Sequence, residues 1–211
     1  MTTTTDAIEH MIEITGQPAG SVRLIARHLR DDPDGDLWPK GRKGGGRFAA
    51  HVGPDHLANL LLGILAADII AGAPAVVRRL RAFEPTRVTE FKGIVPTPDI
   101  TDLRPAGAYD QSIDSADLKW LGPTLGEAID NIIRHSSNNM TKNIISDLKP
   151  SVFLYRRHAF EIVTIRCGHI EKAFTSVDLF SNHQSPSPCA VTFTAAAPFD
   201  LLAAMIGLLN P

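Results

Sequence analysis

The chain has 211 residues, of which 44% are hydrophobic and 21% charged, and its formal net charge is −2. This is the composition of an ordinary globular protein with enough apolar side chains for a core. It excludes a protein that wraps nucleic acid through overall positive charge, so any basic surface must be local. The two cysteines, Cys167 and Cys189, exclude a disulfide framework, and we expect both to be reduced.

Neither a signal peptide nor a membrane span is predicted. The first residues, MTTTTDAIEH, are threonines and acids where a signal peptide would have a basic and then an apolar segment. The longest apolar stretch, residues 57–77, is interrupted by Asn59, Asp68 and a Gly-Ala-Pro turn, whereas a span needs about 20 nearly unbroken apolar residues. We therefore expect a cytoplasmic protein.

The N-terminal part is predicted to begin with two helices. Thr5 and Asp6 can cap the first, which ends at Gly16-Gln17-Pro18. The second runs from Ala19 to about Arg30, where the acidic turn of residues 31–36 stops it. Two short β segments, residues 37–38 and 48–52, are then expected on either side of a basic, glycine-rich loop.

The remaining elements follow from hydrophobic periodicity and from Pro and Gly positions. Helices are expected over residues 56–70 and 74–83, the first opened by Gly53-Pro54-Asp55. The proline-containing stretch that follows indicates a linker with one possible strand at residues 88–95. Beyond it we expect an amphipathic helix, four strands and a final helix, over residues 124–136, then 152–155, 160–166, 170–176 and 190–195, and then 198–209.

An arginine stripe marks the second predicted helix. Its apolar residues recur at helical spacing and would face a core, whereas Arg23, Arg27 and Arg30 project from the opposite face. Guanidinium groups at this spacing can contact phosphate oxygens or the guanine acceptors of the major groove. Ser21, near the start of the helix, is a further candidate DNA contact. By itself the stripe is more typical of a solvated outer helix face.

A basic segment follows within a few residues. Lys40, Arg42, Lys43 and Arg47 are interleaved with Gly41 and a Gly-Gly-Gly run. Because glycine loses the most backbone entropy when it is fixed, we expect a loop that becomes ordered against the phosphate backbone or the minor groove. The string is neither a Walker A motif nor a GxGxxG turn, which argues against a nucleotide site.

The order helix, turn, basic helix, strand, basic loop, strand over residues 22–52 resembles winged helix-turn-helix proteins, including bacterial and phage regulators. Together with the predicted elements it implies an α+β protein. Residues 1–84 would form the winged helix-turn-helix domain, 85–115 a linker, and 116–211 a smaller α+β domain with an antiparallel sheet. The acidic turn departs from the family pattern, and its charge must point away from DNA if the interpretation holds.

The resemblance implies a transcriptional regulator that binds double-stranded DNA as a dimer, with residues 116–211 joining the subunits. A phage DNA-packaging protein fits the same features. The alternative is a non-enzymatic assembly component, in which residues 60–65 and the C-terminal helix form subunit contacts. A second basic cluster, Arg78, Arg79 and Arg81, suits either DNA contact or the negative end of its own helix dipole.

No catalytic, metal or cofactor site is predicted. The eight histidines form neither an HExxH motif nor a zinc set with cysteine, and no GxSxG elbow occurs. The acids are dispersed, and we expect Asp130 and Asp147 at the surface. A nuclease would need a metal on Asp31, Asp32, Asp34 and Asp36, a run without the terminal glutamate of a calcium loop.

Overall fold

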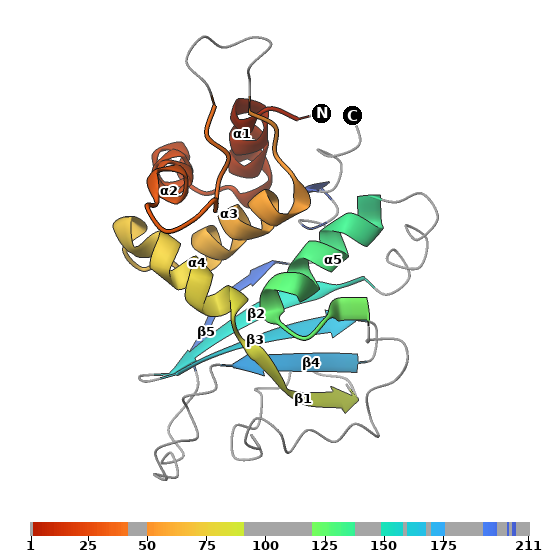
Figure 1. Ribbon diagram of the computed structural model, residues 1–211. Helices are drawn as coiled ribbons and strands as arrows, with labels where there is room; N and C mark the ends of the chain where they lie inside the picture. The colour runs from red at the N-terminus through yellow and green to blue at the C-terminus, as the bar shows by residue number, and fades with distance from the viewer. Residues whose placement is uncertain are drawn as a thin grey trace.

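The computed structural model describes residues 2–41, 50–90, 120–137, 149–157, 160–167, 170–175, 192–197, 202, 204 and 205. These residues form α-helices and an antiparallel sheet, which confirms the expected α+β class. Figure 1 shows the helices gathered on one side of the sheet, with α5 lying directly across it. Within the described part of the chain, no helix is both long and apolar enough to cross a membrane.

The first two helices are joined by a short turn, as expected. Helix α1 (Thr4–Thr15) is capped by Thr3, whose hydroxyl oxygen accepts a hydrogen bond from the Asp6 amide at 3.2 Å. The cap therefore lies two residues earlier than the sequence suggested. Gly16 ends α1 in the left-handed conformation, with φ of 63°, which glycine adopts without steric cost. Helix α2 (Ala19–Asp31) follows after Pro18.

The expected β segments between α2 and the next helix are not found within residues 37–41 and 50–52. Trp38 is instead buried, and its ring meets the His56 ring edge to face, with centroids 6.4 Å apart. The β contact of His51 is an isolated bridge to Thr3, at the start of α1. The tip of the expected wing falls on residues 42–49, which lie outside the described residues.

Two helices and a short 3₁₀ turn complete this part of the chain. Helix α3 (Pro54–Ala66) begins with proline at its first position, as expected, and ends four residues earlier than expected. The 3₁₀ helix η2 (Ile70–Gly72) leads into α4 (Ala73–Arg81). Gly63 allows α2 to approach α3 closely, because a Cβ atom there would lie 2.8 Å from Cγ2 of Ile25.

Five strands form one antiparallel sheet in the order β1-β4-β3-β2-β5. Their bounds are Glu84–Glu90 for β1, Ser151–Arg157 for β2, Phe160–Cys167 for β3, Ile170–Thr175 for β4 and Thr192–Ala197 for β5. The four C-terminal strands confirm the alternating patterns of the sequence. Strand β1 starts earlier than expected and pairs with β4, so residues 85–90 of the expected linker belong to the sheet; residues 91–115 lie outside the described residues.

One hydrophobic cluster joins the two halves of the chain. Helix α5 (Leu125–Ser137) contacts α3 and α4, and its fully buried Ile129 and Ile133 belong to the same cluster as Leu61 of α3 and Phe174 of β4. Residues 202, 204 and 205 are helical, and the remainder of the expected last helix lies outside the described residues. The expected division at residues 85–115 therefore does not separate two cores.

Candidate nucleic-acid interface

Helix α2 has one buried face and one exposed face. Val22, Ile25, Ala26 and Leu29 are buried against the neighbouring helices. The arginine stripe (Arg23, Arg27 and Arg30) lies on the exposed side, with side chains that are 56%, 67% and 45% exposed. Ser21 is half-buried at the start of the helix, and Lys40 is exposed beyond its end. The spacing of the apolar residues thus predicted the orientation of α2 correctly.

Every arginine of the stripe contacts a carboxylate, which the sequence analysis did not anticipate. Arg23 donates from Nη2 to both carboxylate oxygens of Glu9, at 2.8 and 3.0 Å, and from Nε to Oε1 at 3.2 Å. Glu9 lies on α1, so this ion pair joins the two helices across their turn. The only sequence signal for it is the packing of α1 against α2 that a helix-turn-helix requires.

Asp31 is the carboxylate partner of the other two arginines. Arg30 donates from Nε to Oδ1 at 2.8 Å and from Nη2 to Oδ2 at 3.1 Å, and Nε of Arg27 lies 3.6 Å from Oδ2. The hydrogen bond from Arg30, with a smaller contribution from Arg27, lowers the pKa of Asp31 below its usual range. Asp31, the first residue of the acidic turn (residues 31–36), therefore lies against the stripe, so it does not meet the condition that the winged-helix interpretation sets for this turn.

The rest of the acidic turn faces α4. Asp32 is 5% exposed and contacts the Arg78 guanidinium, and Nη1 of Arg78 lies 3.5 Å from Oδ2 of Asp34. These contacts neutralise the turn and withdraw Asp32 from solvent. In the part of the chain that the structure describes, no three His, Cys, Asp or Glu residues come together in a way that could hold a metal ion.

The basic segment (residues 40–47) emerges from a fixed base. Its flanks meet at Gly41 and Ala50, since a Cβ atom on Gly41 would lie 3.9 Å from the Ala50 backbone nitrogen. Two backbone hydrogen bonds tie the returning chain to the N-terminus, from Thr4 N to Ala50 O at 3.2 Å and from Val52 N to Thr2 O at 3.1 Å. Arg42, Lys43 and Arg47 lie outside the described residues.

The basic cluster on α4 serves internal contacts. Besides Arg78, Arg79 donates from Nη2 to Oε2 of Glu161 on β3 at 2.5 Å. Arg81 donates from Nη1 and Nη2 to the two oxygens of Asp130 on α5, at 3.0 and 2.6 Å. The three arginines therefore connect α4 to the acidic turn, to the sheet and to α5. Each of the three has one carboxylate partner, Asp32, Glu161 or Asp130, that is better buried than those of the arginine stripe.

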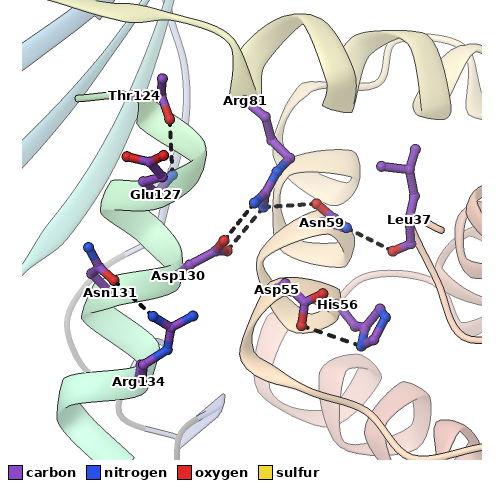
Figure 2. A network of polar contacts seen from close by, with 10 residues as sticks. All are labelled: Leu37, Asp55, His56, Asn59, Arg81, Thr124, Glu127, Asp130, Asn131 and Arg134. Atoms are coloured by element: carbon purple, nitrogen blue, oxygen red, sulfur yellow. Dashed lines mark hydrogen bonds and ion pairs between the residues drawn. The ribbon is translucent and has the colours of Figure 1, made fainter. Parts of the chain in front are cut away.

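Figure 2 shows how Arg81 extends this contact into a network between α3 and α5. Its Nη1 also donates to Oδ1 of Asn59 at 3.0 Å, and Nδ2 of Asn59 donates to the Leu37 carbonyl at 2.8 Å. Asp130 is 8% exposed, so its expected position at the surface is wrong. Its place beside Ile129 in the apolar stripe was a signal for burial, but its partner could not be read from the sequence.

Four of the six residues in the expected subunit contact (residues 60–65) are buried within the chain, whereas Ile64 and Leu65 are half-buried. Leu60, Leu61 and Leu62 are at most 1% exposed because they pack within their own chain. The large apolar side chains that are exposed in the described residues are Leu24, at 44%, and Ile69, at 74%. The C-terminal Leu202 and Met205 are also buried.

No protein-family model, characterised protein or solved structure matches the chain. Its function must therefore be inferred from the chemistry of its own residues. In the described residues, the exposed cationic side chains include the three of the arginine stripe on α2 and Lys40 at the base of the basic segment.

Proposed function

We propose that the protein binds double-stranded DNA through the exposed face of α2 and the basic segment, as winged helix-turn-helix proteins do. One observation carries the proposal: three arginines, each at least 45% exposed, lie on one side of a helix whose other side is buried. A helix held in this way can present its guanidinium groups to the backbone or to the major groove. Ser21, Lys40, Arg42, Lys43 and Arg47 are the further contacts that we propose.

The ion pairs of the stripe do not prevent this role. Ion pairs between exposed side chains contribute about 0–1 kcal/mol, so a phosphate can replace a carboxylate at small cost. A DNA phosphate offers the guanidinium the same two-oxygen geometry. It carries one negative charge, as a carboxylate does, and the neighbouring phosphates of the duplex add to the attraction. The pairs do reduce the positive potential of the face, so we expect modest affinity that depends strongly on salt.

The experiment is fluorescence anisotropy of the full chain with a labelled duplex of random sequence, across a salt series. We expect the logarithm of affinity to fall linearly with the logarithm of salt, with a slope of about −0.9 for each phosphate neutralised. Arg27→Gln should weaken binding to all sequences and reduce the slope by about one. Arg134→Gln, which removes an exposed arginine on α5, is the matched control and should change neither. Absence of binding by the wild-type chain at low salt would reject the proposal.

The proposal extends to a dimeric transcriptional regulator of bacterial or phage type, acting in the cytoplasm. Helix α2 has 13 residues and is about 20 Å long at 1.5 Å per residue, so it covers a single half-site. Two copies on two half-sites would supply the affinity that one lacks. Sedimentation velocity with and without a duplex measures how many protein chains bind each duplex. A complex of one chain with one long duplex would contradict the proposed dimer. A DNA-packaging role shares the same interface.

Exposed apolar residues favour a second candidate, an assembly component without DNA contact. Leu24 lies on α2 itself, and Ile69 directly precedes η2, which α2 contacts. Replacing both with serine should then reduce self-association in sedimentation velocity. Substitution of the arginine stripe by glutamine separates the candidates, because it should abolish DNA binding under the first and leave assembly intact under the second.

A further inference from the structure

We infer that Glu9 and Asp31 restrain DNA binding, because they occupy the guanidinium groups that the phosphates would use. The inference rests on the proposed function and concerns the regulation of the same site. It identifies two acidic residues, one on each helix of the α1–α2 pair, as competitors built into the interface. Their removal should strengthen binding, whereas removal of other acidic residues nearby should not do so to the same extent.

The Glu9 carboxylate occupies a position on Arg23 that a DNA phosphate could take. Both carboxylate oxygens accept from Nη2 of Arg23, and Oε1 also accepts from Nε. A DNA phosphate that makes a two-oxygen contact with the Nε–Nη2 edge of Arg23 would need these same N–H groups. Glu9 is 52% exposed, so no burial holds it in place and the exchange remains possible. A phosphate contact on that edge of Arg23 must therefore displace Glu9 first.

Asp31 restrains two arginines with one carboxylate. It accepts two hydrogen bonds from Arg30 and lies within ion-pair distance of Arg27. It is also the last residue of α2, where a negative charge is unfavourable with respect to the helix dipole. Asp31 is therefore not needed to stabilise the helix end. Together the two carboxylates cancel two of the three positive charges of the arginine stripe.

The test compares substitutions that remove equal charge at different places. Glu9→Gln is compared with Glu13→Gln, an 82% exposed residue on the same helix whose ion pair is with His10. Asp31→Asn is compared with Asp36→Asn, an exposed residue at the end of the acidic turn. Affinity for the random duplex is measured by anisotropy at low salt, and a far-ultraviolet circular dichroism melt verifies that each variant is folded.

We expect Glu9→Gln and Asp31→Asn each to tighten binding by about twofold to fivefold relative to their controls, as befits exposed ion pairs. In an Arg23→Gln background, Glu9→Gln should increase the affinity for DNA no more than Glu13→Gln does. This double-mutant comparison separates a direct exchange at Arg23 from a general change in charge.

Two results would overturn the inference while leaving the proposed function intact. If wild-type protein binds and Glu9→Gln gains no more than Glu13→Gln, Glu9 acts only through net charge. If Glu9→Gln weakens binding, Glu9 instead orients Arg23 for its DNA contact. Absence of binding by the wild type and by every variant would instead reject the DNA interface itself.

Discussion

Six arginines on α2 and α4 pair with carboxylates, and they differ in how deeply those carboxylates are buried. Glu9 and Asp31, the partners of the α2 arginines, are 52% and 51% exposed. Each α4 arginine has a carboxylate partner that is between 5% and 12% exposed, namely Asp32, Glu161 or Asp130, although Arg78 also contacts Asp34, which is 77% exposed. A carboxylate in water loses little when its arginine leaves, whereas a buried one is left uncompensated. The α4 arginines are therefore committed to the fold, and those of α2 can exchange partners.

Substitution of Arg81's partner measures this difference. Asp130→Ala leaves the partly buried Arg81 guanidinium without its carboxylate and should lower the free energy of unfolding by about 3 kcal/mol. Glu9→Ala breaks an exposed pair of similar geometry and should lower it by less than about 1 kcal/mol. Urea denaturation of the two variants gives both values. Equal losses of stability in the two variants would show that the burial of the carboxylate does not decide how much its ion pair contributes to the free energy of unfolding.

The buried thiol of Cys167 predicts a pH dependence of stability. Burial raises the pKa of Cys167 from 9.0 to about 12, because the thiolate would lose its hydration. The pKa of the Cys167 thiol is thus higher in the folded state than in the unfolded state. The contribution of the protonated thiol to the free energy of unfolding is therefore complete below pH 9.0 and is lost as the pH rises towards 12. We expect the free energy of unfolding of the wild type to fall more steeply between these pH values than that of Cys167→Ala. Parallel pH profiles would contradict the raised pKa.

At the scale of single elements, regular periodicity was sufficient for most of the fold. The apolar residues of α2 and α5 recur at helical spacing, and each helix buries the predicted face. The alternation in residues 160–166 predicted β3 nearly to its ends. Proline at the start of α3 marked its beginning correctly. These features depend on neighbours within a few positions, which a single sequence displays.

Features that depend on distant partners could not be predicted. His51 pairs with Thr3 in place of forming the expected hairpin, and Trp38 is buried beside His56. Likewise the exposure of the arginine stripe followed from periodicity, but its carboxylate partner Glu9 lies on another helix. Periodicity thus predicted that these arginines are exposed, whereas the ion pair between Arg23 and Glu9 could not be predicted.

The crossing of α2 and α3 depends on the absence of a side chain at Gly63. Gly63→Ala would place a methyl group 2.8 Å from Cγ2 of Ile25, which is held by its own buried position. The resulting overpacking should lower the free energy of unfolding by about 1–3 kcal/mol, which exceeds the gain of about 1 kcal/mol from helix propensity. Urea denaturation measures the balance.

Gly20 on α2 provides the matched control for this prediction. A Cβ atom there meets nothing within 4 Å. Gly20→Ala should therefore leave stability unchanged or raise it by up to about 1 kcal/mol, through helix propensity and a more restricted unfolded chain. A stabilised Gly63→Ala would mean that α2 and α3 separate without loss of packing.

At the scale of the whole molecule, the single cluster of apolar residues joins parts that the sequence suggested would be separate. α3 contacts both α5 and β5, and α4 leads directly into β1 at the far edge of the sheet. The three α4 arginines reinforce the same connection. A chain held together in this way should unfold in one cooperative step.

The two tryptophans test this cooperativity because one lies in each half. Trp38 is buried beside α3, and Trp120 lies before α5, with its ring centroid 5.6 Å from that of His135. In Trp120→Phe and in Trp38→Phe, the fluorescence of the remaining tryptophan should follow the same urea transition as the far-ultraviolet circular dichroism of that variant. A tryptophan that unfolds at a different urea concentration would indicate two independent units.

The short pairing of residues 2–4 with residues 50–52 gives the N-terminal end of the chain influence over the basic segment. Thr2 is 8% exposed, and its carbonyl oxygen accepts from the Val52 amide. Because the pairing is antiparallel, Thr4 lies opposite Ala50, at the base of the basic segment, and Thr2 lies opposite Val52. Loss of residues 2–4 would therefore remove the two backbone hydrogen bonds that hold the returning side of the basic segment.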